Sequence, residues 1–160
     1  MASAAPRESL PFNAVKPGGE LRTRIAKNFE RLHAEASDAE ILRRRIGVNY
    51  DACHFALEYD AAVSSLDALV EAGIRISKIH LSSALALDPR DPAALAAIRK
   101  FDEPVYFHQV LLRDSRGQIH RFIDLPEFLT NHHPSPDFLE ARVHFHIPLD
   151  AEPAAPLPRC

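Results

Sequence analysis

Short apolar runs alternate along the chain with stretches in which apolar residues recur at helical spacing. The runs predict β-strands at residues 46–50, 74–81 and 141–149, and the helical spacing predicts helices at 20–36, 60–72 and 92–100. Because the 74–81 run is almost continuously apolar, it is typical of a strand buried in a parallel sheet. Strands that alternate with helices predict an α/β fold with right-handed crossovers.

Turn-forming residues predict the remaining elements. Residues 105–113 and 118–124 flank Asp114-Ser115-Arg116-Gly117, which predicts a β-hairpin inserted into the parallel pattern. Short helices are predicted to begin at Ser37, through a capping box that ends in Glu40, and at Asp124. We therefore divide the chain into an irregular lead-in at 1–19, a folded domain at 20–149 and a flexible, Pro-rich tail at 150–160.

Length and composition restrict the class of protein. A chain of 160 residues can form one domain with a core, whereas a complete (β/α)₈ barrel needs roughly 200 to 250. A net charge of −3 gives no electrostatic basis for binding nucleic acid. No apolar run approaches the ~18 residues that span a membrane, and the N-terminus lacks a signal-peptide pattern. We expect a cytoplasmic protein that is not transmembrane.

The clearest candidate for chemistry follows the first predicted strand. Asp51 and His54 lie three residues apart in a strand-to-helix loop, from which both can reach one divalent ion. Alternatively, Asp51 caps the following turn and His54 is a packed or solvated loop residue. Cys53 lies between them, and it is either a soft ligand or a small buried residue.

The second predicted strand carries Lys78 and His80 on one face, because side chains alternate along a strand. A buried Lys there must be paired or have a lowered pKa, whereas a Lys at the strand end can reach solvent. Ser82 and Ser83 follow directly, where hydroxyls and backbone amides could hold a phosphate or a sugar hydroxyl.

Two later segments add polar groups. Glu103 could be a metal ligand or a base, or it could cap a turn, and Tyr106 and His108 share one face of the run that follows. In the last predicted strand, His144 and His146 lie on one face and Val143 and Phe145 on the other. Such an imidazole face needs either a metal ion or a hydrogen-bond network.

Taken together, the order of these motifs resembles the xylose isomerase-like superfamily of sugar phosphate isomerases and epimerases, which are TIM barrels. Within it, the chain is most similar to the EboE family of metabolite-traffic proteins. The resemblance runs from about residue 20 to 149. It is carried by Gly47-Val48-Asn49-Tyr50-Asp51-Ala52-Cys53-His54, Ile74-Arg75-Ile76-Ser77-Lys78-Ile79-His80-Leu81-Ser82-Ser83-Ala84-Leu85, Phe101-Asp102-Glu103-Pro104 with Tyr106-Phe107-His108-Gln109, and Arg142-Val143-His144-Phe145-His146-Ile147-Pro148.

The resemblance implies a partial TIM barrel, about its C-terminal half, with the hairpin as an insertion. It also implies that Asp51, His54 and His80 bind a divalent metal ion (Mn, Zn, Co or Mg) beside a sugar. With the strand pattern, the expected metal ligands are Asp51, His54, His80 and His146. The expected catalytic residues are Glu103 and Lys78, and the expected substrate-binding residues are Ser82, Ser83, Tyr106, His108 and His144.

Three functions follow from these expectations. The first is an EboE-like protein that handles a small polar metabolite, with or without a metal ion. The second is an active metal-dependent sugar isomerase or epimerase, in which the ion holds adjacent oxygens and Glu103 moves the proton. The third is a truncated, inactive barrel. Because a half barrel has unpaired edge strands, we also expect self-association or a partner that supplies the missing half.

Overall fold

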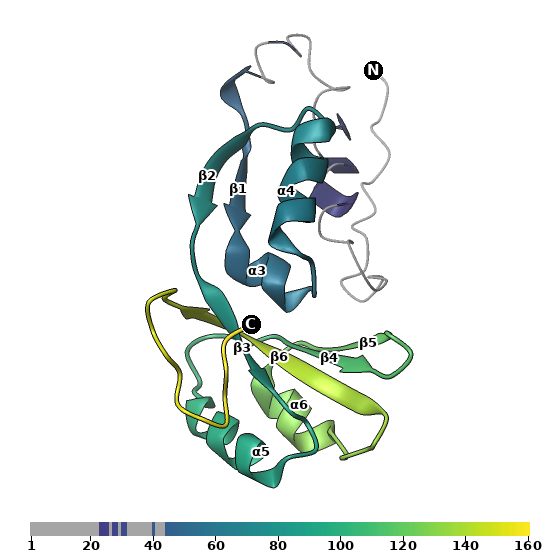
Figure 1. Cartoon of the computed structure of the whole chain (residues 1–160), viewed down its shortest axis with the longest axis vertical. Coiled ribbons are helices and arrows are strands. Elements are labelled where there is room, and N and C mark those ends of the chain that lie inside the picture. The colour runs from purple at the N-terminus through teal and green to yellow at the C-terminus, as the bar shows by residue number, and fades with distance from the viewer. Residues whose placement is uncertain (1–22, 26, 29, 32–39, 41–43) are drawn as a thin grey trace, which may run out of the picture.

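The computed structural model describes residues 23–25, 27–28, 30–31, 40 and 44–160. In this part of the chain, six strands form two sheets (Figure 1). The elements in chain order are β1 (Val48–Asp51), α3 (Ala52–Leu57), α4 (Ala62–Glu71), β2 (Ile76–His80), β3 (Ser83–Leu87), α5 (Pro92–Ile98), the 3₁₀ helix η1 (Arg99–Phe101), β4 (Val110–Asp114), β5 (Ile119–Phe122), α6 (Leu125–Asn131) and β6 (Phe138–Ile147).

The first sheet pairs β1 with β2 in parallel, and α3 and α4 connect the two strands. Its small core contains Tyr50, Phe55, Leu69 and Ile74. Asp51 begins α3, because its side chain accepts a hydrogen bond from the backbone N–H of Cys53 at 3.2 Å. Strands and helices in this order form the βαβ unit that the sequence pattern predicts.

The second sheet has the order β3-β6-β4-β5, and every pair in it is antiparallel. Helices α5 and α6 pack on one face, and α3 contacts β3 and β6 from the other side (Figure 1). The core between the sheet and α5 and α6 includes Leu85, Ile98, Leu112, Phe128 and Val143. Strands β4 and β5 form the predicted hairpin at residues 114–117.

The mixed α/β class is confirmed, but the parallel sheet extends only to β1 and β2. The predicted strand 74–81 ends at His80, and a separate strand, β3, follows after Leu81 and Ser82. All five residues of β3 are buried, because helices cover both faces of its sheet. A buried apolar run is therefore equally compatible with an antiparallel strand. The described residues do not show a partial barrel.

Two sequence predictions concern the ends of the chain. The lead-in at 1–19 lies outside the described residues, and so does most of the short helix predicted from Ser37. Of the predicted helix 20–36, the structure describes positions 23–25, 27–28 and 30–31, and these are helical. The tail at 150–160 was expected to be flexible. Instead, Leu157 is buried in the main core, and the backbone N–H of Cys160 donates to Ala84 at 3.0 Å.

Tyr59 fastens the turn between α3 and α4 to the antiparallel sheet. Its backbone has φ 61°, and its hydroxyl lies 2.8 Å from the Glu140 carbonyl oxygen and 3.1 Å from that of Leu111. The guanidinium groups of Arg142 and Arg113 lie 4.0 and 4.4 Å from the ring centroid. Since α3 carries Asp51 at its N-cap, this contact also positions the site described below.

We expect Tyr59→Phe to lower the free energy of unfolding by about 1–3 kcal/mol, because buried carbonyl groups lose their hydroxyl partner. Urea denaturation measures the change. The matched control is Tyr106→Phe, since the Tyr106 side chain is 70% exposed and its substitution should change stability little. Equal stability losses in the two variants would show that the Tyr59 hydroxyl does not fasten the turn.

Candidate metal centre

Imidazole and carboxylate side chains from three strands and one helix meet where β1 and β2 end. Asp51 is the last residue of β1, and it stands in register with His80, the last residue of β2. His54 follows in the first turn of α3, and β6 contributes His144 and His146. We call these five residues the histidine cluster. Side chains at the carboxyl ends of neighbouring parallel strands are expected to meet in this way.

The four imidazole rings are linked by ring contacts, and His146 contacts the other three. The ring centroid of His54 lies 4.4 Å from that of His144 and 5.9 Å from that of His146. His146 stacks on His80 at 4.8 Å and lies 4.9 Å from His144. The alternation of β6 places His144 and His146 on the same face, as the sequence predicts. The ring of Phe145 lies on the opposite face and packs against the main core.

Asp51 supplies the negative charge of the cluster. One carboxylate oxygen lies 3.2 Å from Nδ1 of His80, and the other lies 3.9 Å from Nδ1 of His146. The Asp51 side chain is 15% exposed, whereas those of His80 and His146 are 46% and 38% exposed. The cluster is therefore open to solvent on the side of these two imidazoles.

Among the residues that the structure describes, two overlapping groups could hold a metal ion, and both include His146. One is Asp51, His54 and His146, and the other is Cys53, His144 and His146. Within each group, the ligand atoms lie within 4.8 Å of one another. Ligands around a tetrahedral zinc ion lie about 3.3 Å apart, given bond lengths near 2.0 Å. Small side-chain rotations would therefore close either group around an ion.

The protonation states favour metal binding by imidazole. Burial is the main cause that lowers the pKa of His54, and burial together with His54 and His146 lowers that of His144 to about 4. Both rings are therefore neutral at pH 7 and have a free lone pair. The Nε2 atom of His144 is buried and has no hydrogen-bond partner among the described residues.

The Cys53 thiol is held in its protonated form. Burial, with a smaller contribution from the Asp51 carboxylate, raises its pKa to about 12. Its Sγ lies 3.1 Å from the Phe145 carbonyl oxygen, to which the thiol donates. A metal ion binds cysteine as the thiolate. The Cys53 thiol must therefore lose its proton before the Cys53 group can bind an ion, and this deprotonation costs free energy.

A hydrogen bond outside the ligand groups orients His146. The hydroxyl of Ser82 lies 2.8 Å from Nδ1 of His146, and Ser82 itself is only 5% exposed. Partners of this kind fix the ring orientation of metal-binding histidines. Ser82 was expected to contact substrate, and the structure places it in contact with the cluster instead.

In the described part of the chain, neither expected catalytic residue forms a hydrogen bond or ion pair with the cluster. Lys78 is exposed on β2, and among the described residues it forms no ion pair. The Glu103 carboxylate accepts hydrogen bonds from the backbone N–H groups of Val105 and Tyr106 at 3.0 and 2.7 Å, and it lies 3.4 Å from Nε2 of His108. Glu103 thus caps a turn, which is the alternative that the sequence left open for it.

The other expected substrate-binding residues divide in a similar way. His144 lies inside the cluster, and Nδ1 of His108 lies 3.0 Å from the His144 carbonyl oxygen. Tyr106 is exposed on the loop after Glu103. Ser83 is buried and bonds to the backbone oxygen of Cys160, so that it holds the tail. This contact had no signal in the sequence, because it joins residues 77 positions apart.

Metal-free protein is expected to lose stability on acidification. The pKa of His144 is about 4 in the folded protein and about 6.5 in an unfolded chain, so the unfolded chain binds the extra proton between these values. The neutral His144 therefore makes its whole contribution to the free energy of unfolding above pH 6.5. The free energy of unfolding falls by about 2–3 kcal/mol as the pH approaches 4. Urea denaturation of chelator-treated protein at pH 7.5, 5.5 and 4.5 measures this loss.

The control for this prediction is a pair of matched variants. His144→Asn should flatten the pH dependence, whereas His133→Asn, at an exposed position, should leave it unchanged. The same pH dependence in both variants would contradict the assignment to His144.

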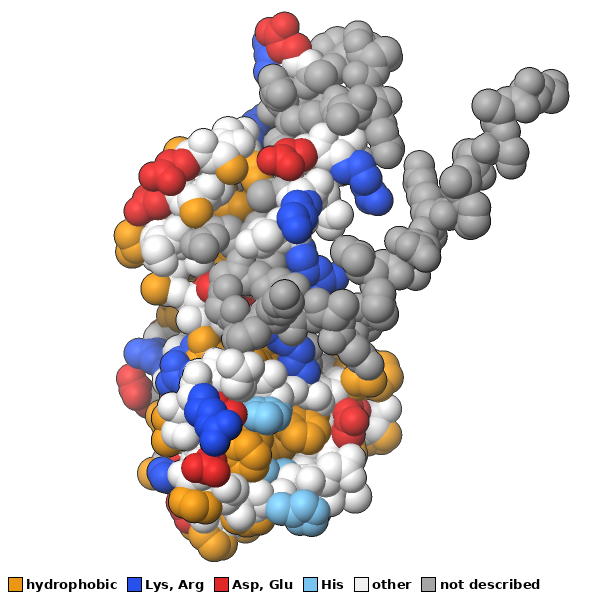
Figure 2. Space-filling view, turned by 90° about the vertical axis from the view of Figure 1, so that its right-hand side faces the viewer, with side chains coloured by type: hydrophobic (Ala, Val, Ile, Leu, Met, Phe, Trp, Pro, Cys, Tyr) orange, Lys and Arg blue, Asp and Glu red, His pale blue; other side chains and the backbone are white. Residues whose placement is uncertain are grey.

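No family model, curated protein or solved structure matches this chain. In the part of the chain that the structure describes, none of the helices has the length and apolar character needed to cross a membrane. Basic and acidic side chains are interspersed on the face shown in Figure 2. The account of function therefore depends on the geometry of the histidine cluster.

Proposed function

We propose that this protein binds one divalent transition-metal ion through Asp51, His54 and His146 and uses it to hold a small polar metabolite. The observation that carries the proposal is the approach of three ligand atoms, one carboxylate oxygen and two imidazole nitrogens, to within 4.8 Å of one another. Since His54 comes from α3 and His146 from β6, the fold brings together ligands that are distant in sequence.

The Asp51 group is favoured over the Cys53 group by its protonation. To bind an ion, the Cys53 group must first lose the proton of a buried thiol whose pKa is raised to about 12. Imidazole and carboxylate ligands together suit Zn, Co or Mn better than Mg, which prefers oxygen ligands alone. His80 contacts the Asp51 carboxylate, so it supports that ligand or joins it on the ion.

The openness of the cluster supports a role in holding a metabolite. Three protein ligands leave coordination positions free for water or substrate, as in catalytic metal sites. The half-exposed rings of His80 and His146 mark the side from which a metabolite would enter. A metal ion in this position would polarise or chelate oxygen atoms of a sugar-like molecule.

The resemblance to EboE and to the wider isomerase superfamily enters the proposal through one unit of the fold. Asp51 and His80 end the parallel strands β1 and β2, and His54 follows in α3, as a (β/α) barrel repeat would place them. We propose that β1–α3–α4–β2 corresponds to one such repeat. The Glu103 carboxylate is engaged by two backbone N–H groups of a turn, which favours metabolite handling over isomerase activity.

Metabolite binding with and without metal tests this function. Aldose and ketose phosphates would be titrated by calorimetry into zinc-loaded, manganese-loaded and chelator-treated protein. We expect at least one to bind about tenfold or more tightly with metal, and His54→Ala to remove this difference. Equal binding with and without metal would contradict the proposal, and conversion of an aldose into a ketose phosphate would indicate the isomerase.

Exposed apolar side chains at the end of β2 and directly after it support the proposal that the chain self-associates. Ile79 and Leu81 are 48% and 64% exposed. We expect light scattering to show a dimer or larger species, and Leu81→Lys to shift it toward the monomer. A monodisperse wild-type monomer would count against association through this surface.

A further inference from the structure

A separate cavity of about 400 Å³ lies beneath the C-terminal tail. We propose that it binds a small molecule with an aliphatic body and an anionic head group. It is distinct from the metal centre, because Ile147 of β6 lines it whereas His144 and His146 point to the other face of that strand. Cavities of this size are typical of sites for small molecules.

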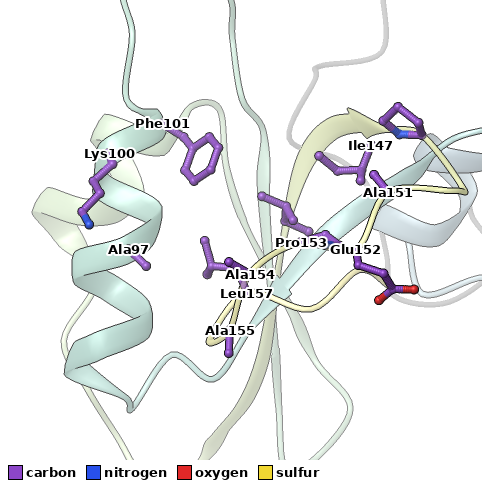
Figure 3. Close-up of a pocket in the computed structure, with 12 residues that line it drawn as sticks. Ala97, Lys100, Phe101, Ile147, Ala151, Glu152, Pro153, Ala154, Ala155 and Leu157 are labelled. Atoms are coloured by element: carbon purple, nitrogen blue, oxygen red, sulfur yellow. The ribbon is translucent and has the colours of Figure 1, made fainter.

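The walls of the cavity are almost entirely apolar. Ala97 of α5 and Phe101 of η1 form one side (Figure 3). The strands contribute Leu85 and Ile147. The tail closes the opposite side, with small side chains at residues 151 and 153–155. An apolar lining offers water few hydrogen-bond partners. Transfer of an aliphatic ligand from water into such a cavity is therefore favourable.

The cavity is held open by the path of the tail. After β6 the chain arches away and returns to β3, where the backbone N–H of Ala86 donates to the Pro158 carbonyl at 2.7 Å. Leu157, 3% exposed, anchors this return in the core. The arch is therefore fixed at both ends, and the alanine and proline side chains between them leave the space unfilled.

The charges at the cavity select the head group. Its two charged lining residues are Lys100 on the side of α5 and Glu152 on the side of the tail (Figure 3). Glu152 lies 3.5 Å from Arg159, which compensates its charge. Lys100 has no ion-pair partner among the described residues, and its long side chain can follow a ligand at the rim. The uncompensated charge is positive, so a carboxylate or phosphate head group is favoured.

Calorimetry with three probes of equal chain length tests the proposal on the intact chain. Octanoate and octyl phosphate carry the anionic head group, and 1-octanol lacks it. We expect saturable binding of at least one anion with a dissociation constant at or below about 1 mM, and binding of 1-octanol at least tenfold weaker. The stronger of the two anions identifies the head group as carboxylate or phosphate.

Variants locate the binding. Ala97→Phe and Ala151→Phe should each fill the cavity from opposite walls and remove binding, and thermal melting shows which variants keep the fold. Lys100→Gln should weaken the anions about tenfold and leave 1-octanol unchanged. His54→Ala should have no effect, which separates this proposal from that of the metal centre. Absence of binding at 1 mM, or binding unaltered in a folded cavity variant, would overturn the proposal.

Discussion

Asp51→Asn is expected to lower the affinity of the protein for zinc or cobalt by at least about 100-fold, because it removes the charged ligand of the proposed site. The substitution is nearly isosteric, and asparagine caps helices as well as aspartate does. Helix α3 should therefore keep its start, and the loss of affinity would report on the ion alone. Titration against a chromophoric chelator measures the change.

Cys53→Ala is the matched control, since Cys53 belongs to the competing ligand group. We expect its metal affinity to stay within about threefold of wild type, because the protonated thiol is not a ligand in this account. The cobalt-loaded protein should also lack the near-ultraviolet charge-transfer band of a cobalt–thiolate bond. A strong band that disappears in Cys53→Ala would assign the ion to the Cys53 group instead.

Gly47→Ala is expected to lower the free energy of unfolding by about 3 kcal/mol, the upper end of the usual cost of overpacking. A Cβ atom at Gly47 would collide with the Arg75 carbonyl oxygen and with Oγ of Ser77 on the neighbouring segment. Since the backbone N–H of Val48 donates to that carbonyl at 2.8 Å, β1 and β2 would have to separate. Asp51 would then lose its register with His80.

Denaturation and metal titration of the same variant measure the two consequences. The control is Gly73→Ala, where nothing lies within 4 Å of the added Cβ but φ is +69°. Strain there should cost about 1 kcal/mol and leave metal affinity unchanged. Adding Ser77→Ala should not rescue Gly47→Ala, because the carbonyl collision remains. Wild-type stability in Gly47→Ala would show that the strands are not so close.

The parts of the fold that depend on local geometry could be predicted from the sequence. A strand followed at once by a helix places Asp51 and His54 one turn apart, and the alternation of a strand places His144 and His146 on one face. The turn and pairing of the β4–β5 hairpin were predicted correctly, because the turn residues are contiguous, although β4 begins at Val110 and not at the predicted residue 105. The first two of these predictions supply four of the five residues of the histidine cluster.

The parts that depend on distant pairing could not be predicted. Nothing in the run that forms β3 shows that its neighbour is β6 and antiparallel, because pairing direction is set by the whole sheet. The tail was expected to be flexible from its prolines, yet Leu157 is buried through contacts that no local pattern encodes. Likewise, Glu103 was a candidate base by residue type, and only the backbone N–H groups around it show that it caps a turn.

The central claim is that the histidine cluster binds one divalent metal ion. The most direct measurement is elemental analysis of protein purified without chelator, for wild type and His54→Ala. The account predicts about one Zn, Co or Mn per chain in wild type and loss of most of it in the variant. No metal in either protein after incubation with these ions, or equal metal content in both, would contradict it.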